Sequence, residues 1–360
     1  MKGSKRTGIE KLRKKIDGID AELLDLLNKR ASIAIEVGRV KKREKSDFYS
    51  PEREREIIKR LTAMNRGPFP SSALRNVYRE IMSASLSLEN PLKVAFLGPS
   101  ATFTHQAALQ HFGLSSEFLP KKDIPDVFDD VERGKAAFGV VPVENTAEGA
   151  VSHTLDMFVS SNLKICAEVM VQVSLTLLNK SGRAGDIMKV CSHPHALAES
   201  GRWLKEHLPN VSVVDVGSTA MAAQMATSDP AMAAIASEAA SSLYDLRVVE
   251  RKIEDHPNNF TRFLVIGKKE SAKTGNDKTS VMFAIKDQPG ALYRILKPFA
   301  ARDINLTKIE SRPLKTKAWE YVYIIDLDGH ISDRKIKEAV GELGQSCSFM
   351  KILGSYQKYQ

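Results

Sequence analysis

The strongest constraint on this chain is a long helical seam interrupted by a cation. Apolar residues recur at alternating intervals of three and four, as in a coiled-coil seam: Ile9, Leu12, Ile16, Ile19, Leu23 and Leu26, then Ile33, Val37 and Val40 after Arg30. At 1.5 Å per residue, residues 9–40 span roughly 48 Å. Two shorter helices, predicted at residues 51–65 and 71–89, cannot cover a seam of that length. We therefore expect an intertwined homodimer.

Arg30 occupies a seam position where an uncompensated guanidinium would be costly. Lys41 lies eleven residues further on, about three turns, and so points the same way. Two cations on an apolar seam indicate an internal pocket for an acidic ligand. An ion pair with Glu22 or Glu54 of the same chain is the alternative.

The positive charge of the chain is concentrated in its first quarter. Of the 53 Lys and Arg and 44 Asp and Glu that give a net charge of +9, residues 1–90 carry 21 and 13. Nucleic acid, a membrane surface or a small polyanion would each fit such a region. No apolar run reaches membrane-spanning length, no secretory leader is evident, and three scattered cysteines form no disulfide framework. We expect a cytoplasmic protein.

The 360 residues predict a multidomain protein with three segments of different texture. Residues 1–90 are predicted to be all-helical. Residues 91–268 alternate short apolar runs with helical patterns, which indicates an α/β domain with a mostly parallel sheet. Its strands are expected at residues 94–97, 136–141, 187–191, 211–214, 233–235 and 263–266, and residues 165–178 suit a crossing between two lobes.

The C-terminal segment, residues 279–360, follows a polar linker predicted at residues 268–279. Its pattern is strand, helix, strand, strand, helix, strand, the order of an α+β ferredoxin-like fold. These elements are expected at residues 280–286, 291–301, 305–310, 320–326, 332–343 and 349–353.

Polar residues gather where strands of the α/β segment end and helices begin. Glu144, Asn145 and Thr146 follow a predicted strand, at the sheet edge where open α/β folds bind ligands. The other turns of this kind offer hydroxyls and free N–H groups to an anion: Thr102 and Thr104, Ser192, and Ser218 and Thr219. One such turn is normally a helix cap, but several indicate a two-lobed cleft for a small anion.

Seven short strings, in the same order, resemble the bifunctional chorismate mutase–prephenate dehydratase family of phenylalanine biosynthesis. They are GPSATFT (98–104), VPVENTAEG (141–149), SHP (192–194), ST (218–219), NFTRF (259–263), GALY (290–293) and ESRP (310–313). The resemblance implies a helical mutase domain, a two-lobed dehydratase domain resembling periplasmic binding proteins, and a C-terminal ACT domain. It implies no cofactor and no metal.

In the first segment, the resemblance places substrate contacts at seven positions: Arg13, Arg30, Lys41, Arg53, Glu54, Ser85 and Glu89. Chorismate is a dicarboxylate, and arginine binds carboxylates bidentately. Its rearrangement to prephenate needs no nucleophile, so catalysis consists of holding the folded conformer and stabilising charge on the ether oxygen. Lys41 suits that oxygen, and Arg13, about 100° around the helix from Arg30, suits the site of the partner subunit.

Two positions of the mutase segment depart from the family. Ser50 stands where an acidic residue is common, and Glu89 stands where glutamine is common. A glutamate can donate a hydrogen bond to the ether oxygen only when it is protonated. We expect mutase activity to be favoured by acidic pH and Glu89→Gln to flatten that dependence. The alternative is that Glu89 is a solvated residue at a helix end.

For the dehydratase, the resemblance implies that prephenate loses its ring carboxylate and hydroxyl to give phenylpyruvate. Thr261 is the candidate beside the departing hydroxyl, although threonine is a weak acid that another group must supply with a proton. His193 belongs to the SHP string, and Arg262 and Phe263 belong to the NFTRF string, so the resemblance makes them candidates for binding the substrate. In a strand, Arg262 faces the opposite way from its neighbours, so a structural role is the alternative. His195 and Glu199 replace glutamines common in the family, and Ala101 replaces a common glycine.

In the last segment, the resemblance implies binding of L-phenylalanine at a subunit interface and feedback inhibition. The effector candidates are Gly290, Ala291, Leu292, Glu310, Ser311, Arg312 and Pro313. A homotetramer is the alternative to a homodimer if the helical and ACT contacts use different surfaces.

A transcription regulator that responds to an amino acid is the alternative function. Such a protein needs a compact helix-turn-helix with a short recognition helix. Here the basic helix is about 32 residues long, and its central cation faces the seam. We therefore expect binding neither to nucleic acid nor to a membrane.

Overall fold

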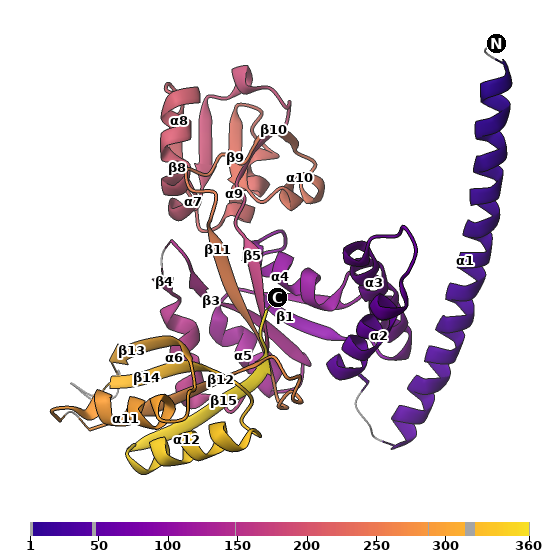
Figure 1. Cartoon of the computed structure of the whole chain (residues 1–360). Coiled ribbons are helices and arrows are strands. Elements are labelled where there is room, and N and C mark those ends of the chain that lie inside the picture. Colours follow the sequence, from indigo (N-terminus) through magenta and orange to yellow (C-terminus); the bar gives the residue numbers. More distant parts are fainter. Residues whose placement is uncertain (1–2, 45–47, 148, 287, 314–320, 360) are drawn as a thin grey trace. The chain divides into compact units, whose positions relative to one another are not determined.

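Three helices form the first of two units in the computed structural model, which describes residues 3–44, 48–147, 149–286, 288–313 and 321–359 (Figure 1). This helical unit comprises residues 1–92 together with 112–117. Its helices are α1 (Gly3–Glu44), α2 (Pro51–Met64) and α3 (Ser71–Glu89). The three predicted helices are confirmed, and α1 is longer at both ends than the seam predicted. Ser50 caps α2 by accepting a hydrogen bond from the Arg53 N–H, and Pro51 occupies the first turn.

The C-terminal part of α1 packs on α3. Gly38 is buried there, and a Cβ added to it would lie 3.0 Å from the Cβ of Glu89, so a larger residue would push the two helices slightly apart. The N-terminal part of the seam is uncovered in the single chain. Six of its side chains are between 52% and 62% exposed: Ile9, Leu12, Ile16, Ile19, Leu23 and Leu26.

The second unit, called the sheet unit here, comprises residues 93–111 and 118–360. Its first sheet has the strand order β2-β1-β3-β11-β5, with the short β4 on β3. These strands are β1 (Lys93–Leu97), β2 (Glu117–Lys121), β3 (Phe138–Asn145), β4 (Gly149–Ala150), β5 (Lys164–Gln172) and β11 (Phe260–Gly267). The helices in this part of the chain are α4 (Phe103–Phe112), α5 (Ile124–Glu132) and α6 (Ser152–Ser160).

The second sheet has the strand order β10-β6-β9-β7-β8. Its strands are β6 (Thr176–Asn179), β7 (Lys189–Ser192), β8 (Ser212–Asp215), β9 (Met232–Ala236) and β10 (Arg247–Arg251). Between them run the short 3₁₀ helix η1 (Ala184–Asp186) and the helices α7 (Pro194–Glu199), α8 (Gly201–His207), α9 (Thr219–Ala226) and α10 (Ala239–Leu243). The predicted crossing at residues 165–178 is confirmed, since β5 belongs to the first sheet and β6 to the second.

The expectation of a mostly parallel sheet is wrong. β1 and β3 are parallel, as are β7 and its two neighbours, but β11 is antiparallel to both β3 and β5. In the second sheet, β6 is antiparallel to both β9 and β10. The chain leaves the first sheet along β5 and returns to it along β11, so these two strands run in opposite directions. The sequence prediction also missed β2, β4 and β10.

The third sheet has the strand order β13-β14-β12-β15, and every neighbouring pair is antiparallel. Its elements are β12 (Asp277–Ala284), α11 (Ala291–Ala300), β13 (Leu306–Pro313), β14 (Tyr321–Asp328), α12 (Arg334–Gln345) and β15 (Phe349–Gln357). The predicted ferredoxin-like order is confirmed; Glu320, expected to begin the third strand, lies outside the described residues. Residues 277–279 were assigned to the linker, but they open β12, where Asp277 and Thr279 are buried.

One apolar core joins the first sheet to the third sheet. It includes Ile165 and Leu264 from the first sheet and Met282, Ile324 and Leu353 from the third. The second sheet is covered by separate apolar clusters on its two sides. The third sheet therefore buries one face against the first sheet and is not connected to it by a flexible linker alone.

Candidate functional site

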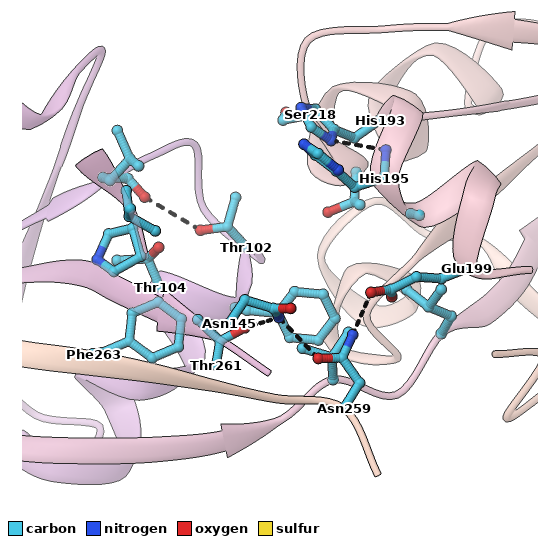
Figure 2. A pocket seen from close by; sticks show the side chains of 18 of the residues that line it. Thr102, Thr104, Asn145, His193, His195, Glu199, Ser218, Asn259, Thr261 and Phe263 are labelled. Atoms are coloured by element: carbon cyan, nitrogen blue, oxygen red, sulfur yellow. Dashed lines mark hydrogen bonds between the residues drawn. The ribbon is translucent and has the colours of Figure 1, made fainter. Parts of the chain in front are cut away.

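A cleft of about 370 Å³ opens between the lobes built on the first and second sheets (Figure 2). Val173 and Leu175, on the segment from β5 to β6, form part of its lining, and so does Asn259, on the return segment to β11. Backbone hydrogen bonds link the two segments: the N–H of Val173 donates to the Asn259 carbonyl, and that of Ile253 to the Leu175 carbonyl. The volume lies within the range of small-molecule pockets.

A chain of hydrogen bonds runs along the cleft and ends at Thr261 (Figure 2). Asn259 donates through Nδ2 to the Glu199 carboxylate, which can only accept when ionised. The Oδ1 of Asn259 then faces Asn145, whose Nδ2 donates to it at 2.8 Å and also to Thr261 Oγ1 at 2.8 Å. Thr261 Oγ1 therefore accepts within the protein, which leaves its own proton available to a molecule in the cleft.

Helix starts contribute further polar groups from both lobes. Thr102 precedes α4, and its Oγ1 accepts from the His105 N–H and donates to the Pro99 carbonyl. Ser218 caps α9 through the Met221 N–H, and His193 caps α7 through the His195 N–H. Thr104 and Thr219 complete this set of lining residues.

Eight of the twelve predicted dehydratase residues line this cleft: Thr102, Thr104, Asn145, His193, Ser218, Thr219, Thr261 and Phe263. Four charged or polar lining residues were not among those candidates: Lys122, His195, Glu199 and Asn259. Asn259 belongs to the NFTRF string, and Lys122 immediately precedes Asp123, the cap of α5. The same reasoning about strand-to-helix turns could therefore have found Lys122.

The other four candidates lie outside the cleft lining. Ser192 is fully buried, and its hydroxyl donates to the Ile235 carbonyl at 2.6 Å, so its expected contact with an anion is corrected to a structural role. Thr146 Oγ1 accepts from the Phe260 N–H at 2.9 Å and so holds the turn that presents Asn259. Glu144 and Arg262 face away from the cleft, toward the third sheet, as the strand alternation at Arg262 allowed.

Ala101 adopts a left-handed conformation with φ of 66° at the turn before α4. Glycine adopts this region without steric cost, whereas other residues pay roughly 1–2 kcal/mol. The turn is held by two hydrogen bonds: Ala101 N–H donates to His105 Nδ1 at 3.1 Å, and Ser237 donates to the Ala101 carbonyl at 2.8 Å. Burial lowers the pKa of His105, which keeps Nδ1 available as an acceptor.

A second group of polar side chains lies where α1 packs on α3 in the helical unit. Arg30 donates through Nη1 to Ser85 Oγ, and Lys41 Nζ lies 3.5 Å from Glu89 Oε2 and donates to the Phe48 carbonyl at 2.8 Å. In the described part of the chain, neither cation pairs with Glu22 or Glu54. Lys41 nevertheless forms an ion pair within the chain, so the alternative of an internal ion pair is confirmed for Lys41, with Glu89 as the partner.

Glu89 is 10% exposed at its side chain, so the alternative of a solvated helix end is also wrong. Its Oε2 is buried and has no hydrogen-bond partner among the described residues, although it faces Lys41. On α2, burial raises the pKa of Glu54 to about 7. Arg53 is exposed and pairs with Glu56, and Arg13 is exposed on the uncovered part of α1. A single helical unit therefore brings Arg30 next to Ser85 and Lys41 next to Glu89. It leaves the candidates Arg13 and Arg53 exposed to solvent.

The predicted effector residues lie at two places in the third-sheet domain. Gly290 precedes α11 with φ of 74°, a left-handed turn that suits glycine, and Leu292 is exposed on that helix next to Ala291. On β13, Ser311 and Pro313 are exposed while Glu310 is half-buried. Arg312 instead contacts α6, donating to Ser152 Oγ and to Asp156 Oδ1.

Three family descriptions match successive parts of the chain. Chorismate mutase type II matches residues 12–90, prephenate dehydratase matches residues 94–271, and the ACT domain matches residues 279–345. A bifunctional chorismate mutase/prephenate dehydratase from Aquifex aeolicus is 49% identical over 97% of this chain and 98% of its own length. Its counterpart from Pseudomonas aeruginosa is 44% identical, also over 97% and 98%.

The sheet unit also has a solved structural relative. The prephenate dehydratase of Arthrobacter aurescens, determined in complex with L-Phe, is 35% identical with a TM-score of 0.69. The match covers 74% of this chain and 90% of that one.

The folds, the cleft and the three matching families define a multidomain enzyme in which a helical mutase precedes a two-lobed dehydratase and an ACT domain. The chain belongs to the bifunctional chorismate mutase/prephenate dehydratase family, as its sequence strings indicated. The alternative of a transcription regulator is not supported. In the described residues, no helix is both long and apolar enough to cross a membrane.

Proposed function

We propose that the helical unit rearranges chorismate to prephenate in a pocket shared by two subunits. Arg30 and Arg53, with Arg13 of the partner subunit, bind the two carboxylates. Lys41 stabilises the ether oxygen as its bond breaks, and Glu89 donates a hydrogen bond to that oxygen when it is protonated. Glu54 and Ser85 complete the pocket. The uncovered seam of α1 supports a homodimer, because exposed side chains such as Leu12, Ile19 and Leu26 need a partner surface.

The sheet unit then converts prephenate to phenylpyruvate. The bond between the ring and its carboxylate breaks to release carbon dioxide, and its electron pair enters the ring. The hydroxyl on the opposite side of the ring leaves as water with a proton that passes through Thr261, which takes up a proton from the solvent in turn. The observation that carries this assignment is the position of Thr261 in the cleft, where its Oγ1 accepts from Asn145 and its own proton is left for the departing hydroxyl.

Polar groups at the helix starts, with Lys122, hold the substrate in the cleft. Thr102 and Thr104 approach it from the first lobe, and Ser218 and Thr219 from the second. Free N–H groups at helix starts favour bound carboxylates, and Lys122 adds a positive charge. Holding prephenate between the lobes excludes water from the breaking bonds.

The C-terminal domain binds L-phenylalanine and inhibits the dehydratase. The turn at Gly290 and the outer face of β13, with Ser311 and Pro313, are exposed and available to an effector at a subunit interface. A homotetramer forms if this interface and the α1 seam join different pairs of subunits. The domains are assigned to residues 1–90, 91–268 and 279–360, and the compartment to the cytoplasm, consistent with three free cysteines.

Incubating the purified chain with chorismate tests all three assignments at once. Chorismate, prephenate and phenylpyruvate are quantified over time with and without phenylalanine. We expect phenylpyruvate to form and phenylalanine to suppress it. Prephenate accumulating alone would contradict the dehydratase assignment. Unchanged chorismate would contradict the mutase assignment, and the dehydratase would then be assayed separately with prephenate as the substrate.

A further inference from the structure

Two neighbouring cross-strand pairs of β3 and β11 face opposite sides of the first sheet. Thr261 is paired with Asn145, and both line the cleft. Arg262 is paired with Glu144, and both face the third sheet. Asn145 and Thr261 in the cleft are therefore each next in the chain to a charged residue, Glu144 or Arg262, on the other face of the sheet.

A buried ionic cluster occupies the space behind the cleft. Arg262 donates through Nε to Glu168 at 2.8 Å, through Nη1 to Asp326 at 2.7 Å, and through Nη2 to Tyr356 at 2.9 Å. Lys278 adds a second cation, 2.9 Å from Glu168. Burial raises the pKa of Tyr356 well above its ordinary value, and Asp326 adds to that effect, so the phenol stays neutral.

Lys308 is the third cation of the cluster, and it comes from β13. Its Nζ lies 2.8 Å from Glu144 Oε2, and its side chain is only 10% exposed. With Glu144, Glu168 and Asp326 as the anions, three cations meet three anions. Such a cluster is stable only while every charge keeps its partner.

β13 presents two faces with different surroundings. Its even-numbered residues from Leu306 to Arg312 are half-buried, and its odd-numbered residues are exposed. Lys308 contacts Glu144 beneath the cleft, and Arg312 contacts Asp156 on α6. The outer face of the same strand carries Ser311 and Pro313, which we placed at the effector site.

We propose that Lys308 is a positioning residue that connects effector binding on β13 to the dehydratase cleft through its ion pair with Glu144. Glu144 precedes Asn145, which holds Thr261, so a shift of β13 alters the orientation of the Thr261 hydroxyl. Arg262 fixes the paired strand from the same side. This inference rests on the proposed inhibition by phenylalanine and names the contact that transmits it.

The test compares Lys308→Met with Lys308→Arg and with Lys335→Met, a matched change at an exposed position on α12. Dehydratase rates are measured with prephenate over a range of phenylalanine concentrations, and mutase rates on the same samples report folding of the helical unit. We expect Lys308→Met to raise the half-inhibitory phenylalanine concentration about tenfold or more. Lys308→Arg should restore most of the inhibition, and Lys335→Met should behave as the unmodified chain.

A double-mutant cycle with Glu144→Gln tests whether the ion pair between Lys308 and Glu144 transmits the inhibition. If the ion pair transmits inhibition, Lys308→Met and Glu144→Gln together raise the half-inhibitory concentration no more than either change alone. Additive effects would overturn the inference. Normal inhibition of Lys308→Met would overturn it too, while leaving the proposed function intact. An unmodified chain that phenylalanine does not inhibit would overturn both.

Discussion

The Thr261 hydroxyl is oriented by a chain of hydrogen bonds that begins at the Glu199 carboxylate, and this carboxylate determines which group donates at each step. Because the Glu199 carboxylate accepts, Asn259 must present Nδ2 to it and Oδ1 to Asn145. Asn145 is held further by the Ala147 N–H, which donates to its Oδ1 at 2.8 Å. A glutamine in place of Glu199 could turn either way and would not determine this direction. The glutamate therefore orients Asn259 and Asn145, and through them the Thr261 hydroxyl.

Thr261→Ala should lower the dehydratase kcat by about 10²–10⁴-fold, because the departing hydroxyl loses its hydrogen-bond donor. Thr261→Ser keeps the hydroxyl and should remain within about tenfold of the unmodified chain. Phenylpyruvate formation from supplied prephenate measures both, and the mutase rate controls for folding. A dehydratase rate in Thr261→Ala equal to that of Thr261→Ser would contradict this role.

Glu54 predicts a pH dependence for the mutase. Burial raises the pKa of Glu54 to about 7, well above its ordinary value, so Glu54 is mostly neutral below pH 7 and mostly ionised above it. An ionised Glu54 repels the chorismate dianion, so kcat/KM for chorismate should fall as pH rises through about 7. This profile reports groups of the free enzyme.

Glu54→Gln should remove that fall, and Glu89→Gln serves as the comparison. If the pH dependence persists in Glu54→Gln and is lost in Glu89→Gln, the titrating group is Glu89, as the sequence alone suggested.

At the scale of elements, α1 is more than a scaffold for Arg30 and Lys41. α3 packs on its C-terminal part around Gly38, while the seam from Ile9 to Leu26 is more than half exposed and Ile33, Val37 and Val40 are exposed as well. An exposed seam of this length in one chain indicates a surface that a second copy covers. Arg13 lies on this uncovered part, where the proposed homodimer would bring it to the pocket of the partner subunit.

Leu23→Asp should disrupt the dimer, because it places a charge in the shared seam. Ala21→Asp is the matched control, since residue 21 lies about 200° around the helix from seam residue 19. We expect the first variant to lose most mutase activity and sediment as a smaller species, and the second to keep both properties. Equal mass and mutase activity in the two variants would contradict a dimer built on α1.

At the scale of the whole molecule, the two units distribute the chemistry. The helical unit is the mutase domain, while both dehydratase lobes and the ACT domain belong to the sheet unit, in which the first lobe and the ACT domain share one apolar core. The buried ionic cluster lies within that shared region. Changes in the cluster should therefore affect the dehydratase and leave the mutase active.

Arg262→Met should destabilise the sheet unit by about 3–5 kcal/mol, because it takes the ion-pair partner from buried Asp326 and leaves buried Glu168 with Lys278 alone. Arg334→Met removes an exposed ion pair with Glu338 and should change stability by less than about 1 kcal/mol. Both tryptophans lie in residues 118–360, so tryptophan fluorescence during urea unfolding reports this unit. Equal midpoints for the two variants would contradict a stabilising role for the cluster.

Local patterns in the sequence predicted most of the elements and part of the site. The seam spacing predicted α1, and the capping turns led to Thr102 and Ser218. The strands β2 and β10 were missed because they are short, half-exposed edge strands held by pairing with a neighbour. Ser192 was misjudged because its sequence context resembles that of a cap, whereas its hydroxyl meets the carbonyl of Ile235, 43 residues away.

The sequence by itself determined the family, the order of the domains and the presence of cations in an apolar seam. These follow from periodicity, capping and short strings, which depend on neighbours along the chain. Only the tertiary structure decided which partners the charged residues meet. Arg262 meets Asp326 and Lys308 meets Glu144, because strands far apart in sequence bury their faces together and a buried charge must be paired where it lies.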